Sequence, residues 1–126
     1  MTIKEVCEKY GVSADTLRYY ERVGVIPCVN RTKGGIRDFT DEDIKWVENA
    51  ICMRSAGLPV EMLIEYVRLF REGDGTFQAR HELLSEARKE IQQQMDKLQE
   101  TADLLDYKIS RYEEALKTGV LNWPAK

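Results

Sequence analysis

The sequence predicts a mostly α-helical chain, in which a head of short helices and one hairpin precedes a single long helix. Three observations support this prediction. In the first 72 residues, apolar side chains recur at helical spacing and are interrupted at short intervals by Gly or Pro. One interruption, residues 27–39, contains a Gly-Gly pair typical of a hairpin turn. Residues 76–118 contain neither Gly nor Pro and repeat apolar residues in heptads.

Composition limits the class of protein. A chain of 126 residues has room for one small domain, or for a small domain with an extended element. The net charge is −3, but residues 1–54 hold nine basic and nine acidic side chains, so the acidic excess lies later in the chain. Three cysteines without paired spacing argue against a disulfide framework and predict a cytoplasmic location. No apolar run is long enough to span a membrane.

Two short helices joined by a Gly-containing link are predicted over residues 3–10 and 13–23, the signature of a helix-turn-helix. Thr2 and Glu5 form a capping box for the first helix, and Ser13 caps the second. The second would be the recognition helix, the element that lies in a DNA major groove. Its apolar face holds Leu17, Tyr20 and Val23. Its other faces carry hydroxyls and arginines, which bind phosphates and guanine edges, at Thr16, Arg18, Tyr19 and Arg22.

A basic hairpin is predicted directly after the recognition helix. Arg31, Lys33 and Arg37 lie around the Gly-Gly turn, with no acidic residue between them. Next to a helix-turn-helix, such a hairpin is a wing that grips the phosphates of flanking DNA. Taken alone, the same stretch also fits a solvated loop.

Two further helices and then the long helix follow. Thr40 is expected to cap a helix that ends near residue 57, Pro59 to open the next, and Thr76 to cap a helix that continues to about residue 118. The inner face of the first is expected to contain Ile44, Val47, Ile51 and Ser55 or Ala56. The apolar stripe of the second is Leu63, Tyr66, Val67 and Phe70.

The long helix cannot bury its apolar seam against itself. The seam residues are Leu84, Ala87, Ile91, Met95, Leu98, Ala102, Leu105, Ile109, Tyr112 and Leu116. The helix therefore needs a partner, most simply the same helix of a second chain, either parallel or antiparallel. We predict a DNA-binding domain with a helix pair over residues 1–72, a linker and dimerisation helix over 73–118, and a short apolar tail over 119–126 that packs back on the chain.

Three stretches of the chain resemble the MerR family of bacterial transcription regulators. Residues 17–27, LRYYERVGVIP, are similar to the family's LRYYE…GLI.P signature. Residues 35–39, GIRDF, resemble its G.R.Y wing, and residues 54–58, RSAGL, its R..G.. hinge into the fourth helix. The resemblance implies a winged-helix homodimer held by an antiparallel coiled coil. It also implies a transcription regulator rather than an enzyme. Such a regulator distorts the spacer of pseudo-palindromic promoter DNA so that RNA polymerase engages both promoter elements. No cofactor is expected.

Matching positions carry the family's DNA contacts onto this chain. The resemblance implies contacts from the recognition helix and from the wing, at Thr16, Arg18, Tyr19, Arg37 and Phe39. The family's usual wing Tyr is Phe39 here, so a phosphate hydrogen bond from its hydroxyl is lost.

For two of the candidate DNA-contacting residues, the sequence leaves a second role open. Tyr20 is either a DNA contact or a core residue, because it shares an apolar face with Leu17. Arg22 either contacts DNA or pairs with Asp15 or Glu21.

The cysteines are the candidate sensor. Metal-sensing relatives carry cysteines at the start of the dimer helix and in the loop after it, but residues 83–126 here contain no Cys and no His. Cys52 looks like the lone cysteine of the family branch that responds to aldehydes and nitrosative stress, where its thiolate would be the nucleophile. The alternative is a small buried thiol in the third helix. Cys7 is expected in the core, and Cys28 in a loop without an evident partner.

Other functions stay open at this point. One alternative is a coiled-coil adaptor without DNA binding, and another is a regulator of this family whose inducer binds non-covalently. A thiol enzyme is disfavoured, because the single histidine, His81, is remote in sequence from the cysteines and a catalytic Cys usually needs a His base.

Overall fold

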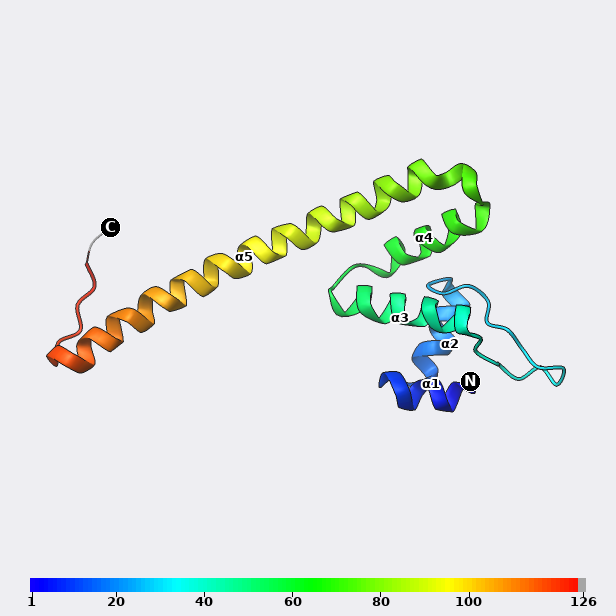
Figure 1. Ribbon diagram of the computed structural model, residues 1–126, viewed down its shortest axis with the longest axis horizontal. Helices are drawn as coiled ribbons and strands as arrows, with labels where there is room; N and C mark the ends of the chain where they lie inside the picture. Colours follow the sequence, from blue (N-terminus) through cyan, green and yellow to red (C-terminus); the bar gives the residue numbers. More distant parts are fainter. Residues whose placement is uncertain (125–126) are drawn as a thin grey trace. The chain divides into compact units, whose positions relative to one another are not determined.

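The computed structural model describes residues 1–124, which are almost entirely helical or in short connections (Figure 1). The elements in order are α1 (Ile3–Tyr10), α2 (Ala14–Val23), α3 (Asp41–Ser55), α4 (Val60–Glu72), the short 3-10 helix η1 (Asp74–Thr76) and α5 (Phe77–Thr118). The prediction of a mostly α-helical chain, with a helix-turn-helix head and a long last helix, is confirmed. The chain divides into two compact units, the first ending at Ala87 and the second beginning at Arg88.

Local sequence signals account for the starts of the first three helices. Thr2 and Glu5 form the expected capping box, with Glu5 N–H donating to Thr2 Oγ1 at 3.2 Å and Thr2 N–H to Glu5 Oε1 at 2.9 Å. Ser13 Oγ accepts a backbone N–H from the first turn of α2 at 3.0 Å. Thr40 and Asp43 form a second capping box before α3. Each of these motifs lies within four consecutive residues, so the sequence alone is enough to find it.

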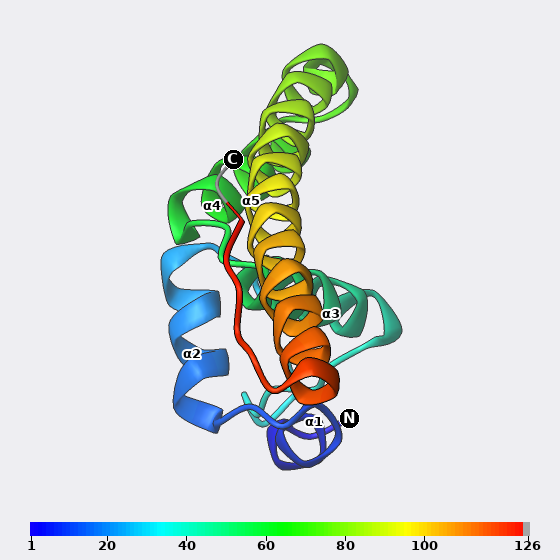
Figure 2. The ribbon, with the colours of Figure 1, turned by 90° about the vertical axis from the view of Figure 1, so that its left-hand side faces the viewer.

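The link between α1 and α2 is short because a glycine reverses the chain. Gly11 closes α1 in the left-handed region, at φ 67°, where a side chain would be strained. Figure 2 views α1 nearly end-on while α2 lies in the plane of the picture and runs upward, so the two helices are steeply inclined to each other. This is the geometry of a helix-turn-helix.

The connection from α4 to α5 differs from the prediction. Thr76 belongs to η1, and its hydroxyl donates to the carbonyl oxygens of Leu69 at 2.6 Å and of Gly73 at 2.7 Å. The prediction that Thr76 caps α5 is therefore wrong, because its hydroxyl bonds to carbonyl oxygens in the last turn of α4 and at Gly73.

The core of the first unit draws on α1 to α4 and on the segment that follows α2. Its most deeply buried side chains are Leu17, Ile26, Leu63, Val6, Val25, Val47 and Val67. In α3 the buried face runs through Ile44, Val47 and Ala50, so Ala50 takes the place predicted for Ile51, while Ser55 and Ala56 are exposed.

The apolar stripe of α4 is also partly rotated from the prediction. Leu69 is buried, whereas Phe70 is 42% exposed. The ring of Phe70 packs edge-on against that of Trp46 in α3, with centroids 4.9 Å apart, and so contributes at the margin of the core.

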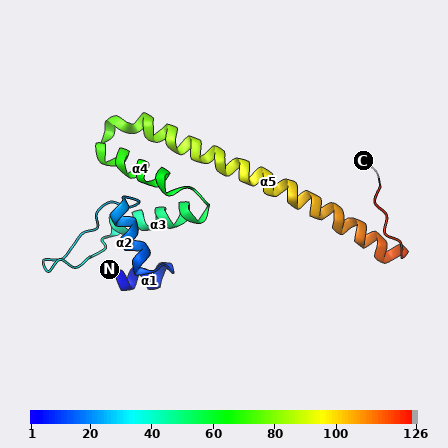
Figure 3. The same ribbon diagram turned by 180° about the vertical axis from the view of Figure 1, so that it is seen from behind.

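The hairpin after α2 projects beyond the helices of the first unit (Figure 3). It is held by an isolated antiparallel bridge between Arg31 and Arg37, and no regular strand occurs among residues 1–124. Thr32 N–H donates to Ile36 O at 2.8 Å, and Gly35 N–H closes the turn on Thr32 O at 2.9 Å. The stretch is therefore a short hairpin, as predicted.

In the second unit, the seam of α5 lies open in the single chain. Six predicted seam residues in this unit have large exposed side chains: Met95, Leu98, Leu105, Ile109, Tyr112 and Leu116. Beyond the helix, the ring of Trp123 lies 6.1 Å from that of Tyr107 and 5.8 Å from that of Tyr112. The tail folds back on α5 as far as Pro124, and residues 125 and 126 of the predicted tail lie outside the described part.

Candidate nucleic-acid interface

The exposed face of α2 carries two arginines with different neighbours. Arg18 Nη1 lies 3.1 Å from Asp15 Oδ1, with the two side chains 50% and 96% exposed. Such solvent-exposed ion pairs contribute little to stability, so Arg18 can exchange its carboxylate for a phosphate or a base edge at low cost. The guanidinium of Arg22 lies over the ring of Tyr19, 5.5 Å from its centroid. Arg22 is thus held beside Tyr19, and Asp15 pairs with Arg18 instead.

Two other side chains of α2 lie at the edge of this face. Thr16 is half-buried, and its Oγ1 is 2.8 Å from Ser13 Oγ, so its hydroxyl takes part in the helix cap. Tyr20 is also half-buried, with its ring 6.2 Å from that of Tyr19. Tyr20 therefore lies between the core and the exposed face, in line with the two alternatives drawn from the sequence.

The hairpin that follows this helix carries three basic side chains, two of which reach Glu21 of α2. Arg31 and Lys33 are exposed, and Arg37 is 24% exposed at the base of the hairpin. Arg31 Nη1 donates to Gly35 O at 2.8 Å, which braces the turn from within.

Glu21 of α2 joins the recognition helix to the hairpin. Its Oε2 accepts the backbone N–H of Val29 at 2.6 Å, and its Oε1 accepts from Arg37 Nε at 2.7 Å. Arg31 Nη2 lies 3.7 Å from the same Oε1. We call these four residues the Glu21 cluster. Through this cluster, one carboxylate on α2 holds both arms of the hairpin.

The electrostatics of the Glu21 cluster favour the ionised carboxylate. The side chain of Glu21 is only 10% exposed, and this burial by itself raises its pKa. The hydrogen bonds from Val29 N–H and Arg37, with the positive charges of Arg37 and Arg31, outweigh burial, so the pKa of Glu21 lies below its ordinary value. Arg37 is held through Nε alone among residues 1–124, which leaves its terminal nitrogens for other acceptors.

Sequence reasoning missed the role of Glu21. The sequence identifies Glu21 only as a residue of the LRYYE block and as a possible partner of Arg22. The hydrogen-bond partners of Glu21 are eight and sixteen residues away along the chain, so no local pattern identifies them. The available signal was an acidic residue near the end of the recognition helix, followed by a hairpin with three basic residues.

Phe39 does not lie on this surface. Its side chain is 3% exposed, and its backbone N–H donates to Met1 O at 2.7 Å, which ties the base of the hairpin to the chain before α1. A ring buried in the core is not available to DNA, and this corrects the assignment of the Phe39 ring as a contact. The burial also gives a reason for the missing hydroxyl, since a buried phenol would need a hydrogen-bond partner.

The cysteines lie in three different surroundings. Cys52 is exposed on α3, and Cys7 is half-buried on α1. The alternative of a buried thiol at position 52 does not fit the single chain. Arg54 is directed away from Cys52, because its Nη1 donates to Leu58 O at 2.5 Å across the corner between α3 and α4.

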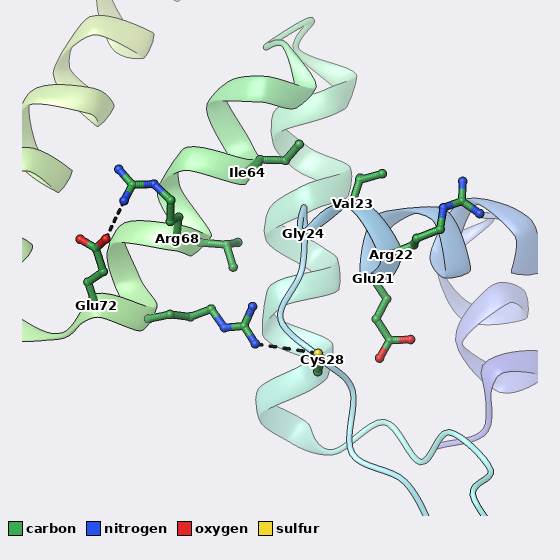
Figure 4. A pocket seen from close by; sticks show the side chains of 10 residues that line it. Glu21, Arg22, Val23, Gly24, Cys28, Ile64, Arg68 and Glu72 are labelled. Carbon is green, nitrogen blue, oxygen red and sulfur yellow. Dashed lines mark hydrogen bonds and ion pairs between the residues drawn. The ribbon is translucent and has the colours of Figure 1, made fainter.

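Cys28 lines a cavity of about 530 Å³ between the end of α2 and α4 (Figure 4). The thiol is exposed, and Arg71 Nη2 lies 3.8 Å from its Sγ. The expectation that Cys28 has no partner is corrected by this contact. Ile64 and Val67 supply apolar walls of the cavity.

Two further features of the described residues concern metal ions and membranes. Residues 1–124 contain no group of three or more His, Cys, Asp or Glu side chains placed to hold a metal ion. Within the same part of the chain, no helix has the length and apolar character needed to cross a membrane.

A helix-turn-helix whose second helix exposes arginines and tyrosine, joined by a carboxylate to a basic hairpin, defines a DNA-binding protein of the winged-helix class. A family model described as "MerR HTH family regulatory protein" matches residues 1–69. The chain belongs to the MerR family and is a DNA-binding transcriptional regulator.

Relatives and solved structures extend this result along the chain. The HTH-type transcriptional regulator AdhR of Bacillus subtilis is 54% identical over 91 residues, which cover 72% of this chain and 65% of AdhR. An uncharacterized HTH-type regulator of Haemophilus influenzae is 33% identical over 118 residues, covering 94% and 87% of the two chains. These relatives are transcriptional regulators and not enzymes.

Two crystal structures match nearly the full length. One is a putative MerR family regulator from Listeria monocytogenes, at a TM-score of 0.90 and 49% identity, covering 94% of this chain and 90% of that one. The other is HiNmlR, a MerR family regulator lacking the sensor domain, bound to promoter DNA. It matches at a TM-score of 0.80 and 32% identity, covering 95% of each chain.

Proposed function

We propose that this chain acts as a homodimer that binds a pseudo-palindromic promoter site with two heads and alters transcription in response to an electrophile. The observation that carries the proposal is the attachment of the basic hairpin to α2 through the Glu21 cluster. The recognition helix would enter the major groove while the hairpin grips the neighbouring backbone. HiNmlR, which matches this chain over 95% of its length, is bound to promoter DNA without a sensor domain, and this supports the same arrangement here.

We divide the proposed DNA contacts into those of α2 in the major groove and those of the hairpin with the phosphate backbone. From α2 we assign Thr16, Arg18, Tyr19 and Arg22, with Tyr20 at the edge. From the hairpin we assign Arg31, Lys33 and Arg37 to phosphates, because all three are basic and belong to the hairpin that follows α2. A set of phosphate contacts predicts affinity that falls steeply with salt.

The seam of α5 supports the dimer. Its large apolar side chains are exposed in the single chain, and a helix of 42 residues with a heptad seam is stabilised by a second helix. We propose an antiparallel pair of α5 helices, which places one head at each end and relates the two recognition helices by two-fold symmetry. Half-sites separated by whole helical turns follow from that symmetry.

The dimer would act by distorting the promoter. Smooth bending of a site of this size costs of order 1–6 kcal/mol, which several phosphate contacts can offset. Distortion of an overlong spacer would bring both promoter elements into register for RNA polymerase, which is the partner we propose.

Cys52 is the proposed sensor. The thiol is exposed on α3, and the chain resembles the branch of the family that responds to aldehydes through one cysteine. With an aldehyde, the sulfur would add to the carbonyl carbon and the thiol proton would move to the carbonyl oxygen. The product is a hemithioacetal, and no oxidant is consumed. The thiolate is the reactive form in this step.

A non-covalent inducer is the second candidate, favoured by the cavity of about 530 Å³ between α2 and α4. This volume falls in the range of small-molecule sites. Its position next to the end of the recognition helix would let a bound molecule affect DNA binding. The two candidates differ in their dependence on Cys52.

One experiment tests the proposed function. Promoter binding and transcription in vitro are measured with and without an aldehyde, and the modified thiol is located by intact and peptide mass spectrometry. We expect salt-sensitive binding, a change in transcription and an adduct at Cys52. Absence of salt-sensitive binding would favour the adaptor alternative, and a full response without an adduct would favour the non-covalent inducer.

A further inference from the structure

Arg80, in the first turn of α5, holds the joint between α4 and α5. Its Nε donates to Thr76 Oγ1 at 2.9 Å. Its Nη2 donates to Gly73 O at 2.7 Å and also lies 3.4 Å from Phe70 O. One guanidinium therefore bonds to the last turn of α4, to the residue that ends it, and to the 3-10 turn that follows.

The same guanidinium lies between two aromatic rings. Its central carbon is 5.2 Å from the ring centroid of Phe70 in α4 and 5.0 Å from that of Phe77 in α5. Arginine stacks well on aromatic faces because its charge is delocalised and weakly hydrated. Phe70 in turn packs on Trp46 of α3. We call Arg80, Phe70, Phe77 and Thr76 the Arg80 clamp.

The Arg80 clamp lies at the C-terminal end of α4, where backbone carbonyl groups need hydrogen-bond donors. The last carbonyls of α4 have no intrahelical donor, and a positive charge there complements the helix dipole. Gly73 ends α4 with φ 98° and ψ −167°, outside the left-handed helical geometry of the usual glycine cap. The backbone N–H groups of Gly73 and Thr76 donate to Phe70 O at 3.2 Å and to Gly73 O at 3.1 Å, and the side chains of Thr76 and Arg80 add further donors to this helix end. The shape of the turn therefore rests on these side chains together with two backbone hydrogen bonds.

We infer that Arg80 is a positioning residue, which fixes the direction in which α5 starts from α4 and thereby selects the half-site separation that the regulator accepts. This inference rests on the proposed dimer. The 42 residues of α5 span about 63 Å at 1.5 Å per residue, so a 5° change at its start displaces the far end by about 5 Å. A base-pair step is about 3.4 Å. A change of a few degrees in the direction of α5 at the clamp therefore displaces its far end by more than one base-pair step.

The test uses two variants and one control in the full chain. Arg80→Ala removes the hydrogen bonds and the stacked charge, and Arg80→Lys keeps a charge near the rings but loses the forked donors. Arg68→Ala is the control, because Arg68 is an exposed arginine of α4 that pairs with Glu65 and Glu72 on the surface. Each protein is titrated against a single half-site and against full sites whose half-site separation changes by one base pair at a time.

We expect wild type and Arg68→Ala to share one sharp optimum of separation. Arg80→Ala should bind the single half-site as wild type does and remain dimeric, while its preference for the optimum over the neighbouring separations falls roughly tenfold, within the usual range of coupling between sites. Arg80→Lys should fall between the two. A role in folding alone would lower single-half-site binding and leave the spacing profile unchanged.

Each outcome decides a specific point. A wild-type spacing profile in Arg80→Ala overturns this inference and leaves the dimer proposal standing. A wild-type protein without any optimum overturns the proposed dimer, and this inference with it. If Arg80→Ala does not fold, Phe77→Leu is measured, since it removes one ring and keeps every hydrogen bond of the clamp; a broadened optimum supports the inference, and an unchanged one overturns it.

Discussion

Replacing Glu21 by glutamine removes one negative charge from the Glu21 cluster and keeps the shape of the side chain. In the native protein the carboxylate accepts from Val29 N–H at 2.6 Å and from Arg37 Nε at 2.7 Å. Glutamine keeps one oxygen acceptor and adds donors that face the guanidinium of Arg37. We expect the hairpin to remain in place but to be held less tightly against α2.

The magnitude follows from the two charge-assisted hydrogen bonds. A hydrogen bond to a charged group contributes about 1.5–3 kcal/mol, compared with about 0.5–1.5 kcal/mol for a neutral one. Arg37 and Arg31 are 24% and 46% exposed, so solvent screens part of the difference, and the amide avoids the cost of burying a charge. We therefore expect Glu21→Gln to lower the free energy of unfolding by about 1–2 kcal/mol.

DNA binding should weaken by a similar free energy, because the hairpin must be ordered again when it meets the phosphates. Since 1.4 kcal/mol is tenfold in affinity, we expect a loss of roughly 5–30-fold. Urea unfolding and titration of a promoter fragment at fixed salt measure the two effects. Glu65→Gln is the matched control, because it removes a carboxylate from an exposed ion pair with Arg68, a class of pair that contributes little.

The pH dependence gives a second readout of the same variant. The pKa of Glu21 is lowered in the folded chain, so its contribution is complete above its ordinary value of 4.5 and is lost as pH falls through the lowered value. The stability difference between wild type and Glu21→Gln should therefore be constant near neutral pH and shrink below pH 4.5. Equal stability and affinity of Glu21→Gln, Glu65→Gln and wild type at pH 7 would refute the role given to the Glu21 cluster.

Three further predictions concern the proposed contacts, the sensor and the dimer. Arg18→Ala and Arg37→Ala should each weaken promoter binding and leave the dimer intact, with the slope of log affinity against log salt reduced by about 1 for each lost phosphate contact; unchanged slopes and affinities in titrations over several salt concentrations would count against these contacts. Cys52→Ser should bind the promoter normally and lose the transcriptional response to an aldehyde, whereas Cys28→Ser should keep it, and a normal response in Cys52→Ser would exclude the sensor role. Leu105→Glu should dissociate the dimer in size-exclusion chromatography because it places a charge in the seam, whereas Leu104→Glu, equally exposed but off the predicted seam, should not; identical elution of the two variants would contradict the assigned seam.

Helix boundaries were predictable where the signals are local. The boxes at Thr2 and Thr40 and the cap at Ser13 each involve a side chain and a backbone group three residues apart. The hairpin turn follows in the same way from its adjacent glycines. These features depend on the chain within one turn, so no knowledge of the tertiary structure is needed.

The features that sequence reasoning missed depend on contacts between distant segments. Glu21 meets Arg37 sixteen residues away, and Arg80 reaches Phe70 ten residues back across the joint. Phe39 is buried, and the hydroxyl of Thr76 bonds to Leu69 O instead of capping α5. Both outcomes depend on neighbours that the periodicity of apolar residues does not reveal. Residues of a candidate DNA surface could be listed from the sequence, but the side chains that hold that surface together could not.

Sedimentation equilibrium of the full chain tests the central claim most directly, because two heads at a set distance require two chains joined along α5. The measurement is made at concentrations where the promoter fragment is bound. We predict twice the chain mass of 14.6 kDa for the free protein, and two chains on each DNA fragment. A single-chain mass with one chain per fragment would contradict the account.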